Sequence, residues 1–406
     1  MGKKYDDMAI FDDRGMRTPD EEELGLQQED QSFLVLDWYV YYLNLARELL
    51  KASCAENGQR NVIVSPFSLY VLLVLAMNAT AGQSQKEIKE VVAKDYTIKN
   101  LTDRIRSFQK DACMQMKGGK LASSNGICVE ASIFDKILPE FKEGTGKALD
   151  AEFFSGGDNA VQRINDWVKI KTDGMIEKLL DDTPISFKAC LMNAIAFEAK
   201  WLEPYEKYDI KENRDFTNVD GSMSKVTMLS SDEQGYIEDE FFTGFVKPYK
   251  GGKYELMCLL PNKKKSQTFF NRAIENIDFQ KYYMSLDHQY ETSVLMPEFE
   301  YSTESELKEL CMKQGIHEIF TPSGNFGGML KAEAGPIMVD SILQKAYIKV
   351  NREGTKAAAV TGMVCAAGCA PEFDRFKYVT LDRPFVYAIM EKGTKLPVFV
   401  GVVNKL

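Results

Sequence analysis

Apolar and polar positions alternate along this chain with two periods, one typical of helices and one typical of strands. Residues 33–50 are strongly apolar, but Asp37, Asn44 and Arg47 interrupt them. A helix that spans a membrane needs about 20 predominantly apolar residues with few or no charges. We therefore expect an amphipathic helix in this region and no membrane span.

Two helix starts follow this first apolar region. Residues 66–77 are almost wholly apolar, and Ser65 and Pro66 stand at their beginning. Serine as N-cap and proline at the first helical position predict a helix here, and its composition predicts that the helix is buried. Ser84 precedes Glu87 by three residues, which is the order of a capping box and predicts a second helix start.

The middle of the chain predicts a helix followed by a buried strand. Residues 163–180 place Ile164 and Trp167 at helical spacing until a glycine ends the run. Residues 189–197 are almost continuously apolar, as expected for a strand that is buried on both faces. Asn193 is the exception in that strand, so we expect it to find buried hydrogen-bond partners.

The second half of the chain is rich in strands. From residue 226 onward, short apolar runs alternate with turn residues. Residues 342–350 alternate apolar and polar side chains like a strand, and residues 385–390 and 398–403 predict two strands around a short turn. We find no internal repeat.

Composition and charge narrow the class of protein. The chain has 406 residues, 45% of them hydrophobic, and a net charge of -10, which argues against nucleic-acid binding because that depends on clustered lysine and arginine. A basic run at residues 263–265 is interpreted as a loop tip. Residues 1–30 hold ten acidic and four basic side chains, so we expect a flexible tail there and one folded domain over residues 31–406.

Histidine, which hydrolases of the Ser/His/Asp and Cys/His types need beside their nucleophile, is scarce in this sequence. His288 and His317 are the two histidines, and neither stands beside a nucleophile or a second metal-ligand pair. We expect no enzyme activity, no metal and no cofactor. Most of the eight cysteines have apolar neighbours and are expected to pack as small hydrophobic residues, but Cys365 and Cys369 lie in a segment of small side chains.

Residues 354–368, which contain Cys365 and end just before Cys369, are built almost entirely of glycine, alanine, threonine and valine. By composition alone it would be a flexible loop or an alanine-rich helix. Five other motifs occur in order along the chain: NVIVSPFS from residue 61, INDWV from 164, NAIAFEAKW from 193, PEF from 297 and RPFVY from 383. Together with residues 354–368, they resemble the serpins, a family of protease inhibitors, over nearly the whole chain from about Asn61.

The resemblance implies an α+β fold of three β-sheets and about nine helices, with a reactive-centre loop at about residues 352–383. It also implies a mechanism in which a protease cuts this loop, forms an acyl-enzyme, and is trapped when the loop inserts into the central sheet. The resemblance assigns the hinge to eight consecutive residues: Gly354, Thr355, Lys356, Ala357, Ala358, Ala359, Val360 and Thr361. Every second one, from Thr355 to Thr361, is small and would point inward after insertion.

Further roles follow from the same resemblance. Ser65, Ser68, Asn193 and Gln344 would form a polar shutter beneath the insertion path, and Trp201 would lie where insertion begins. The usual loop length places the scissile bond at Gly368–Cys369, with Ala367–Gly368 and Cys369–Ala370 as alternatives. These small, uncharged residues suit the shallow pocket of an elastase-like serine protease, held in a covalent 1:1 complex by a monomeric inhibitor.

Two alternatives remain open on sequence grounds. The chain could be a serpin-fold carrier or chaperone that does not inhibit, or an inhibitor whose loop is gated by oxidation of Cys365 and Cys369. Arg352 and Lys356 stand where the family often has acids, which bears on the speed of insertion. We expect a secreted protein whose leader is absent from this sequence, with a cytoplasmic location as the alternative.

Overall fold

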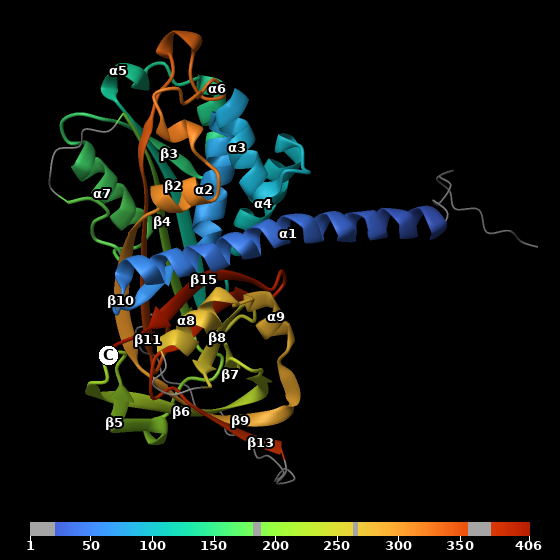
Figure 1. Cartoon of the computed structure of the whole chain (residues 1–406), viewed down its shortest axis with the longest axis vertical. Helices are drawn as coiled ribbons and strands as arrows, with labels where there is room; N and C mark the ends of the chain where they lie inside the picture. The colour runs from blue at the N-terminus through green and yellow to red at the C-terminus, as the bar shows by residue number, and fades with distance from the viewer. Residues whose placement is uncertain (1–20, 182–187, 263–266, 356–374) are drawn as a thin grey trace, which may run out of the picture.

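The computed structural model describes residues 21–181, 188–262, 267–355 and 375–406, and for residues 21–37 it describes the backbone alone. Figure 1 shows a tall sheet with helices against both of its faces at one end, and two further sheets at the other end. Because helices and largely antiparallel strands occupy separate layers, the fold is of the α+β class that we expected.

One central sheet contains six strands and runs through most of the molecule. Its strands are hydrogen-bonded in the following spatial order: β10 (Phe299–Glu306), β11 (Val339–Asn351), β12 (Gly354–Thr355), β4 (Ala189–Lys200), β2 (Gly119–Val129) and β3 (Ala151–Ser155). The predicted strands at 189–197 and 342–350 are confirmed as parts of β4 and β11.

The remaining strands form two sheets that share one long strand, β6 (Met223–Glu238). One of these sheets contains β1 (Val62–Val64), β15 (Leu396–Val403), β14 (Phe385–Glu391), β8 (Tyr254–Pro261) and β7 (Phe242–Pro248). The other contains β5 (Ile210–Thr217), β9 (Asp287–Pro297) and β13 (Phe376–Thr380). With the central sheet this makes three, and β14 and β15 confirm the two predicted C-terminal strands.

The larger core lies between the central sheet and the sheet of β14 and β15, and α2 (Pro66–Ala79) is buried within it. The Ser65 side chain accepts a hydrogen bond from the Ser68 N–H at the start of this helix, as the sequence predicted for an N-cap. The helices α3 (Gly82–Ala93) and α4 (Ile98–Ala112) pack against α2.

The predicted capping box at the second helix is wrong. Helix α3 begins at Gly82, before Ser84, and its N-cap residue makes no side-chain hydrogen bond. The Ser84 hydroxyl instead accepts the N–H of Asn325, and the Glu87 carboxylate accepts the N–H groups of His317 and Glu318. Long-range partners in a neighbouring loop have replaced the local cap, because both side chains face that loop.

The first helix, α1 (Glu21–Asn57), is longer than predicted and extends past the body of the molecule (Figure 1). Its buried residues Trp38, Tyr42 and Leu45 anchor its second half to the main core. No helix in the described ranges is long and apolar enough to cross a membrane.

A second, smaller core lies on the outer face of the central sheet, beneath α7 (Ala160–Lys171). Trp167 and Ile164 of this helix pack against Met192 and Ala194 of β4. The remaining helices are short: α5 (Ala131–Phe134), α6 (Pro139–Phe141), α8 (Gln267–Glu275), α9 (Phe279–Met284) and α10 (Lys308–Lys313). The central sheet therefore has an inner face toward α2 and an outer face toward α7.

Candidate functional site

The seam between β4 and β11 is the structural feature that sets the candidate site. These strands are parallel neighbours over most of their length, with Gln344 opposite Asn193 and Ala346 opposite Ile195. At one end of the sheet they separate, and β12 lies between them, antiparallel to both. After β11 the chain therefore reverses direction, and its next strand, of two residues, already belongs to the central sheet.

A tight turn directs the chain from β11 into β12. The Asn351 side-chain oxygen accepts the N–H groups of Glu353 and Gly354, which closes the turn locally. A Cβ atom at Gly354 would collide with the carbonyl oxygen of Ala199 on β4. Only glycine can therefore approach β4 this closely.

Trp201 and Tyr205 hold this turn through its carbonyl groups. The indole Nε1–H of Trp201 donates to the Asn351 carbonyl at 2.8 Å, and the Trp201 backbone N–H donates to the Glu353 carbonyl at 3.1 Å. The N–H of Tyr205 donates to the Arg352 carbonyl at 3.2 Å. Trp201, which we predicted to lie where insertion would begin, is therefore placed beside β12.

Thr355, the last residue of β12, is buried and turned toward the inner face of the sheet. Its side chain is 1% exposed, and its hydroxyl lies 2.7 Å from the hydroxyl of Tyr249. The Tyr249 ring stacks on Trp201 with centroids 4.5 Å apart and planes 9° from parallel. Burial raises the pKa of Tyr249 well above its usual range, so this hydroxyl keeps its proton.

A buried ion pair lies against the rings of Trp201 and Tyr205. Lys247 and Glu233 are joined at 2.6 Å, and their side chains are only 4% and 7% exposed. The Lys247 ammonium lies 4.5 Å from the ring centroid of Tyr205 and 5.4 Å from that of Trp201. Burial raises the pKa of Glu233, while Lys247 opposes that shift.

Three of the four predicted shutter residues are joined by hydrogen bonds at the inner face of the seam. The Ser65 N–H donates to the Gln344 side-chain oxygen at 2.8 Å, and the Gln344 amide donates to the Ser65 carbonyl at 3.0 Å. The same amide also donates to the Ser68 hydroxyl at 3.2 Å. Gln344 therefore ties β11 to the start of α2.

Asn193 lies opposite Gln344, but its side chain bonds away from the seam, toward β2. Its amide donates to the Asn125 side-chain oxygen of β2 at 2.9 Å and lies 3.5 Å from the Ser123 hydroxyl. Its own oxygen is buried and has no hydrogen-bond partner among the residues that the structure describes. Ser123 and Asn125 were missed in the sequence, although polar residues in a strand that is buried on both faces could have indicated them.

Arg352 directly follows β11, and it binds Glu298, the residue just before β10. The guanidinium nitrogens Nε and Nη2 lie 3.3 and 3.4 Å from the carboxylate, and the Arg352 backbone N–H also donates to it. This pair is partly exposed. The sequence analysis noted Arg352 as a cation at a position that is often acidic. The structure gives it an acidic partner, Glu298, at the start of the neighbouring strand.

Several predicted site residues lie outside the described residues. These are the hinge residues Lys356, Ala357, Ala358, Ala359, Val360 and Thr361, the scissile-bond candidates Ala367, Gly368, Cys369 and Ala370, and the thiol of Cys365. The basic run at residues 263–265 also lies outside them. Within the hinge, the structure places Gly354 and Thr355 alone.

The described cysteines behave largely as the sequence predicted. Cys128, Cys190, Cys258 and Cys311 are buried free thiols, whereas Cys54 and Cys113 are half-buried. His288 and His317 are exposed, on β9 and just after α10 respectively.

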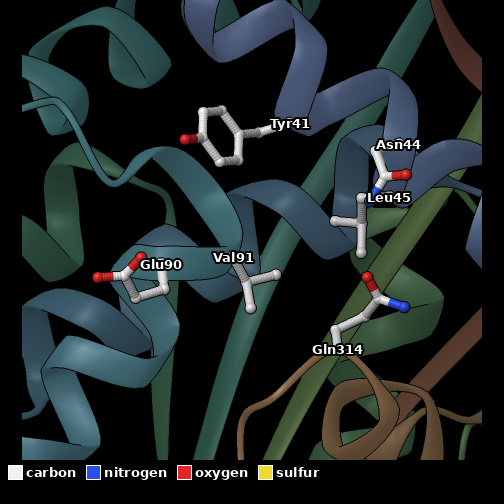
Figure 2. A pocket seen from close by; sticks show the side chains of 6 residues that line it. All are labelled: Tyr41, Asn44, Leu45, Glu90, Val91 and Gln314. Carbon is white, nitrogen blue, oxygen red and sulfur yellow. The ribbon is translucent and has the colours of Figure 1, made fainter.

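Two hollows lie away from the seam. One of about 210 Å³ lies between α1, α3 and the end of α10, where Tyr41, Glu90 and Gln314 are among the lining residues (Figure 2). The other, of about 410 Å³, lies beside Arg375 and His288. The first is smaller than the usual pocket for a drug-sized ligand, and the second falls within that range.

Comparison with known proteins identifies the family. The model of the family "Serpin (serine protease inhibitor)" matches residues 41–406, so the chain belongs to the serpins. The chain is 27% identical to the leukocyte elastase inhibitor of Sus scrofa over 371 residues, which are 88% of this chain and 96% of that protein.

Solved structures agree with this assignment. The native state of tengpin, a thermophilic serpin, matches with a TM-score of 0.82 at 30% identity and covers 91% of this chain and 94% of that one. Thyroxine-binding globulin in complex with thyroxine matches with a TM-score of 0.77 at 22% identity over 93% and 99% of the two chains, a likeness of fold alone.

Proposed function

We propose that this serpin is a suicide-substrate inhibitor of serine proteases, which inserts its cleaved reactive-centre loop between β4 and β11. The observation that carries the proposal is β12: its two residues already occupy the seam, hydrogen-bonded to both neighbours. Insertion would continue a strand that has begun rather than start a new one.

The register of β12 supports this continuation. Thr355 pairs with Val350 on β11 and with Ala199 on β4. Extended along both strands, this register sets Thr361 opposite Gln344 and also opposite Asn193. Those two residues already face each other across the closed seam, so the strands that would flank the loop are in matching register.

The side chains of the hinge suit the space that this register assigns to them. Thr355 points to the inner face, so Ala357 and Ala359 would point there too, because alternate residues of a strand share a face. Their neighbours would include Phe197 and Ile348, both buried. Small apolar side chains fit this core, whereas an unpaired charge would cost several kcal/mol.

The energy for trapping a protease would come from the new strand. About a dozen ladder hydrogen bonds at roughly 0.5–1.5 kcal/mol each would give on the order of 10 kcal/mol. Residues 337–370 contain no proline that would remove a donor from the ladder. The uncleaved protein is then metastable, and cleavage lets it reach the more stable form.

For the target we propose an elastase-like protease. The candidate bait residues Ala367, Gly368 and Cys369 are small and uncharged, which suits a shallow specificity pocket and disfavours trypsin-like enzymes. One relative is named for its inhibition of leukocyte elastase. The chain would bind its protease covalently, 1:1, as a monomer.

Incubation with an elastase tests the proposal. We expect an SDS-stable complex on a denaturing gel and, by mass spectrometry, a released C-terminal peptide that begins at Cys369. A matched pair of variants tests insertion: Ala357→Glu buries a charge and should convert the inhibitor into a substrate, whereas Lys356→Glu changes an outward residue and should still trap.

The opposite results would support other functions. Cleavage without any complex, and without a gain in heat resistance, would indicate a serpin that does not inhibit, such as a carrier. Rapid complexes with trypsin and none with elastase would overturn the proposed target class.

A further inference from the structure

We infer that Tyr249 is a positioning residue for loop insertion: its hydroxyl holds Thr355 in the seam, so that the hinge is docked before any protease cuts the loop. This inference rests on the proposed function and names the contact that would start insertion. The sequence motifs pointed to Trp201 in this region and did not indicate Tyr249.

The Tyr249 hydroxyl is fixed from several sides. Tyr249 follows β7, its N–H donates to the Tyr254 carbonyl at 3.1 Å, and it forms an isolated antiparallel bridge with Trp201. Its ring stacks on Trp201. It also forms a T-shaped contact with the ring of Phe197, with the two ring centroids 5.1 Å apart. The side chain is fully buried, so the position of the hydroxyl is set before the hinge arrives.

Thr355 is the partner that this hydroxyl has among the described residues. Both side chains are out of contact with water. If Thr355 withdrew from the seam, the Tyr249 hydroxyl would lose this buried hydrogen bond, which is unfavourable. The contact therefore favours the state in which Gly354 and Thr355 lie between β4 and β11.

The docked hinge affects the competition that decides whether a protease is trapped. After cleavage, the acyl-enzyme is either hydrolysed, which releases an active protease, or carried along by the inserting loop. Insertion from a docked Thr355 extends an existing strand, whereas a withdrawn hinge must first enter the seam. Tyr249 should therefore raise the fraction of encounters that end in a trapped complex.

Tyr249→Phe removes the hydroxyl and keeps the ring, and Tyr254→Phe provides a matched control. Tyr254 is also buried and also meets the edge of Phe197, at 5.2 Å, but its hydroxyl donates to the Ala112 carbonyl, away from the hinge. Loss of one buried hydrogen bond changes an equilibrium by about fivefold to tenfold.

The first readout is the number of inhibitor molecules consumed for each elastase molecule inactivated. This number exceeds one by the ratio of acyl-enzyme hydrolysis to loop insertion. We expect that excess over one to rise about fivefold in Tyr249→Phe and to stay near the wild-type value in Tyr254→Phe. Thr355→Ser keeps a hydroxyl and should retain trapping, whereas Thr355→Val should reproduce the defect. The double variant Tyr249→Phe with Thr355→Val should be no worse than either single variant.

The second readout needs no protease. Amide hydrogen exchange of the peptide that contains residues 351–355 should be faster in uncleaved Tyr249→Phe than in Tyr254→Phe. Equal exchange in the two variants would overturn the inference, and so would equal trapping. So would faster association without a change in the number consumed, because the docked hinge would then be holding the loop back.

The two proposals can fail separately. If the wild-type protein forms no covalent complex with any serine protease, the proposed function fails, and the exchange experiment still decides whether Tyr249 docks the hinge. If the wild type traps elastase and Tyr249→Phe traps it equally well, the proposed function stands and this inference fails.

Discussion

Gln344 and Asn193 face each other across the seam between β11 and β4, and their side chains bond away from each other. Gln344 bonds to Ser65 and Ser68 beneath it, whereas Asn193 bonds to Asn125 on β2. The structure records no side-chain bond between Gln344 and Asn193 themselves. Separating the two strands at this point would break backbone pairing and leave both polar clusters intact.

Thr361→Val should weaken the cleaved form and leave the uncleaved form unchanged. Continued into an inserted strand, the β12 register would set Thr361 between Gln344 and Asn193, where its hydroxyl could reach the Asn193 oxygen, which has no partner among the described residues. Valine has a similar shape but no hydroxyl, so we expect the cleaved form to lose about 1 kcal/mol. Thermal unfolding of both forms measures this.

A matched substitution one position away provides the control for that prediction. Val360→Thr alters an outward residue by the reverse change, so it should not affect the Asn193 oxygen. Equal loss of stability in cleaved Thr361→Val and cleaved Val360→Thr would mean that the inserted strand does not follow the register of β12.

Gln344→Met should destabilise the uncleaved protein. It would remove three hydrogen bonds and leave the N–H and carbonyl of Ser65 and the hydroxyl of Ser68 without their partner on β11. Because these groups are buried, we expect a loss of about 2 kcal/mol in the free energy of unfolding, measured by denaturant titration.

The neighbouring residue gives the control for Gln344. Lys345 points to the outer face and pairs with Glu304, whose side chain is 53% exposed. Lys345→Met should change the free energy of unfolding by less than about 0.5 kcal/mol. If Gln344→Met proved equally mild, the three hydrogen bonds of Gln344 would not stabilise the uncleaved protein.

The Arg352–Glu298 pair should add only modest stability, because both side chains are partly exposed. Glu298→Gln keeps an acceptor for the Arg352 N–H and removes the charge, so we expect a loss below about 1 kcal/mol that disappears in 1 M salt. The exchanged pair, Arg352→Glu with Glu298→Arg, should recover most of it. A loss that is independent of salt would show that charge is not the cause.

The sequence predicted the elements that local patterns determine. The buried helix after Ser65 and the strand around Asn193 follow from runs of apolar residues with a cap or turn at their ends. The family resemblance supplied the connection between Gln344 and Ser65, which lie 279 residues apart. Periodicity could not have done so, because it carries no information about which distant segments meet.

The parts that were missed depend on tertiary contacts. The capping box at Ser84 failed because Asn325 and His317 compete for its two side chains across the fold. Tyr249 was missed because it stands in an ordinary turn sequence, and its role comes from its contacts with Trp201 and Thr355. Asn125 was missed for the same reason: its role comes from its hydrogen bond to Asn193, which lies on a different strand.

Thiol chemistry separates the simple inhibitor from the redox-gated alternative. Burial raises the pKa of Cys54, Cys113 and Cys311 to about 12 and that of Cys128 to about 11. At pH 8 only about one such thiol in a thousand, or fewer, is ionised, and the thiolate is the reactive form. We therefore expect Ellman's reagent at pH 8 to titrate at most two thiols in the native protein, and all eight in guanidinium.

Because the thiolate fraction rises with pH toward these raised pKa values, the slow reaction of the six described cysteines should accelerate between pH 8 and pH 10. Replacing Cys365 and Cys369 with serine should remove the fast thiols and leave that slow phase. We also expect elastase inhibition to be unchanged by diamide in the wild type and in this double variant. Inhibition that diamide abolishes in the wild type alone would instead establish a redox gate in the loop, because the six described thiols are common to both proteins.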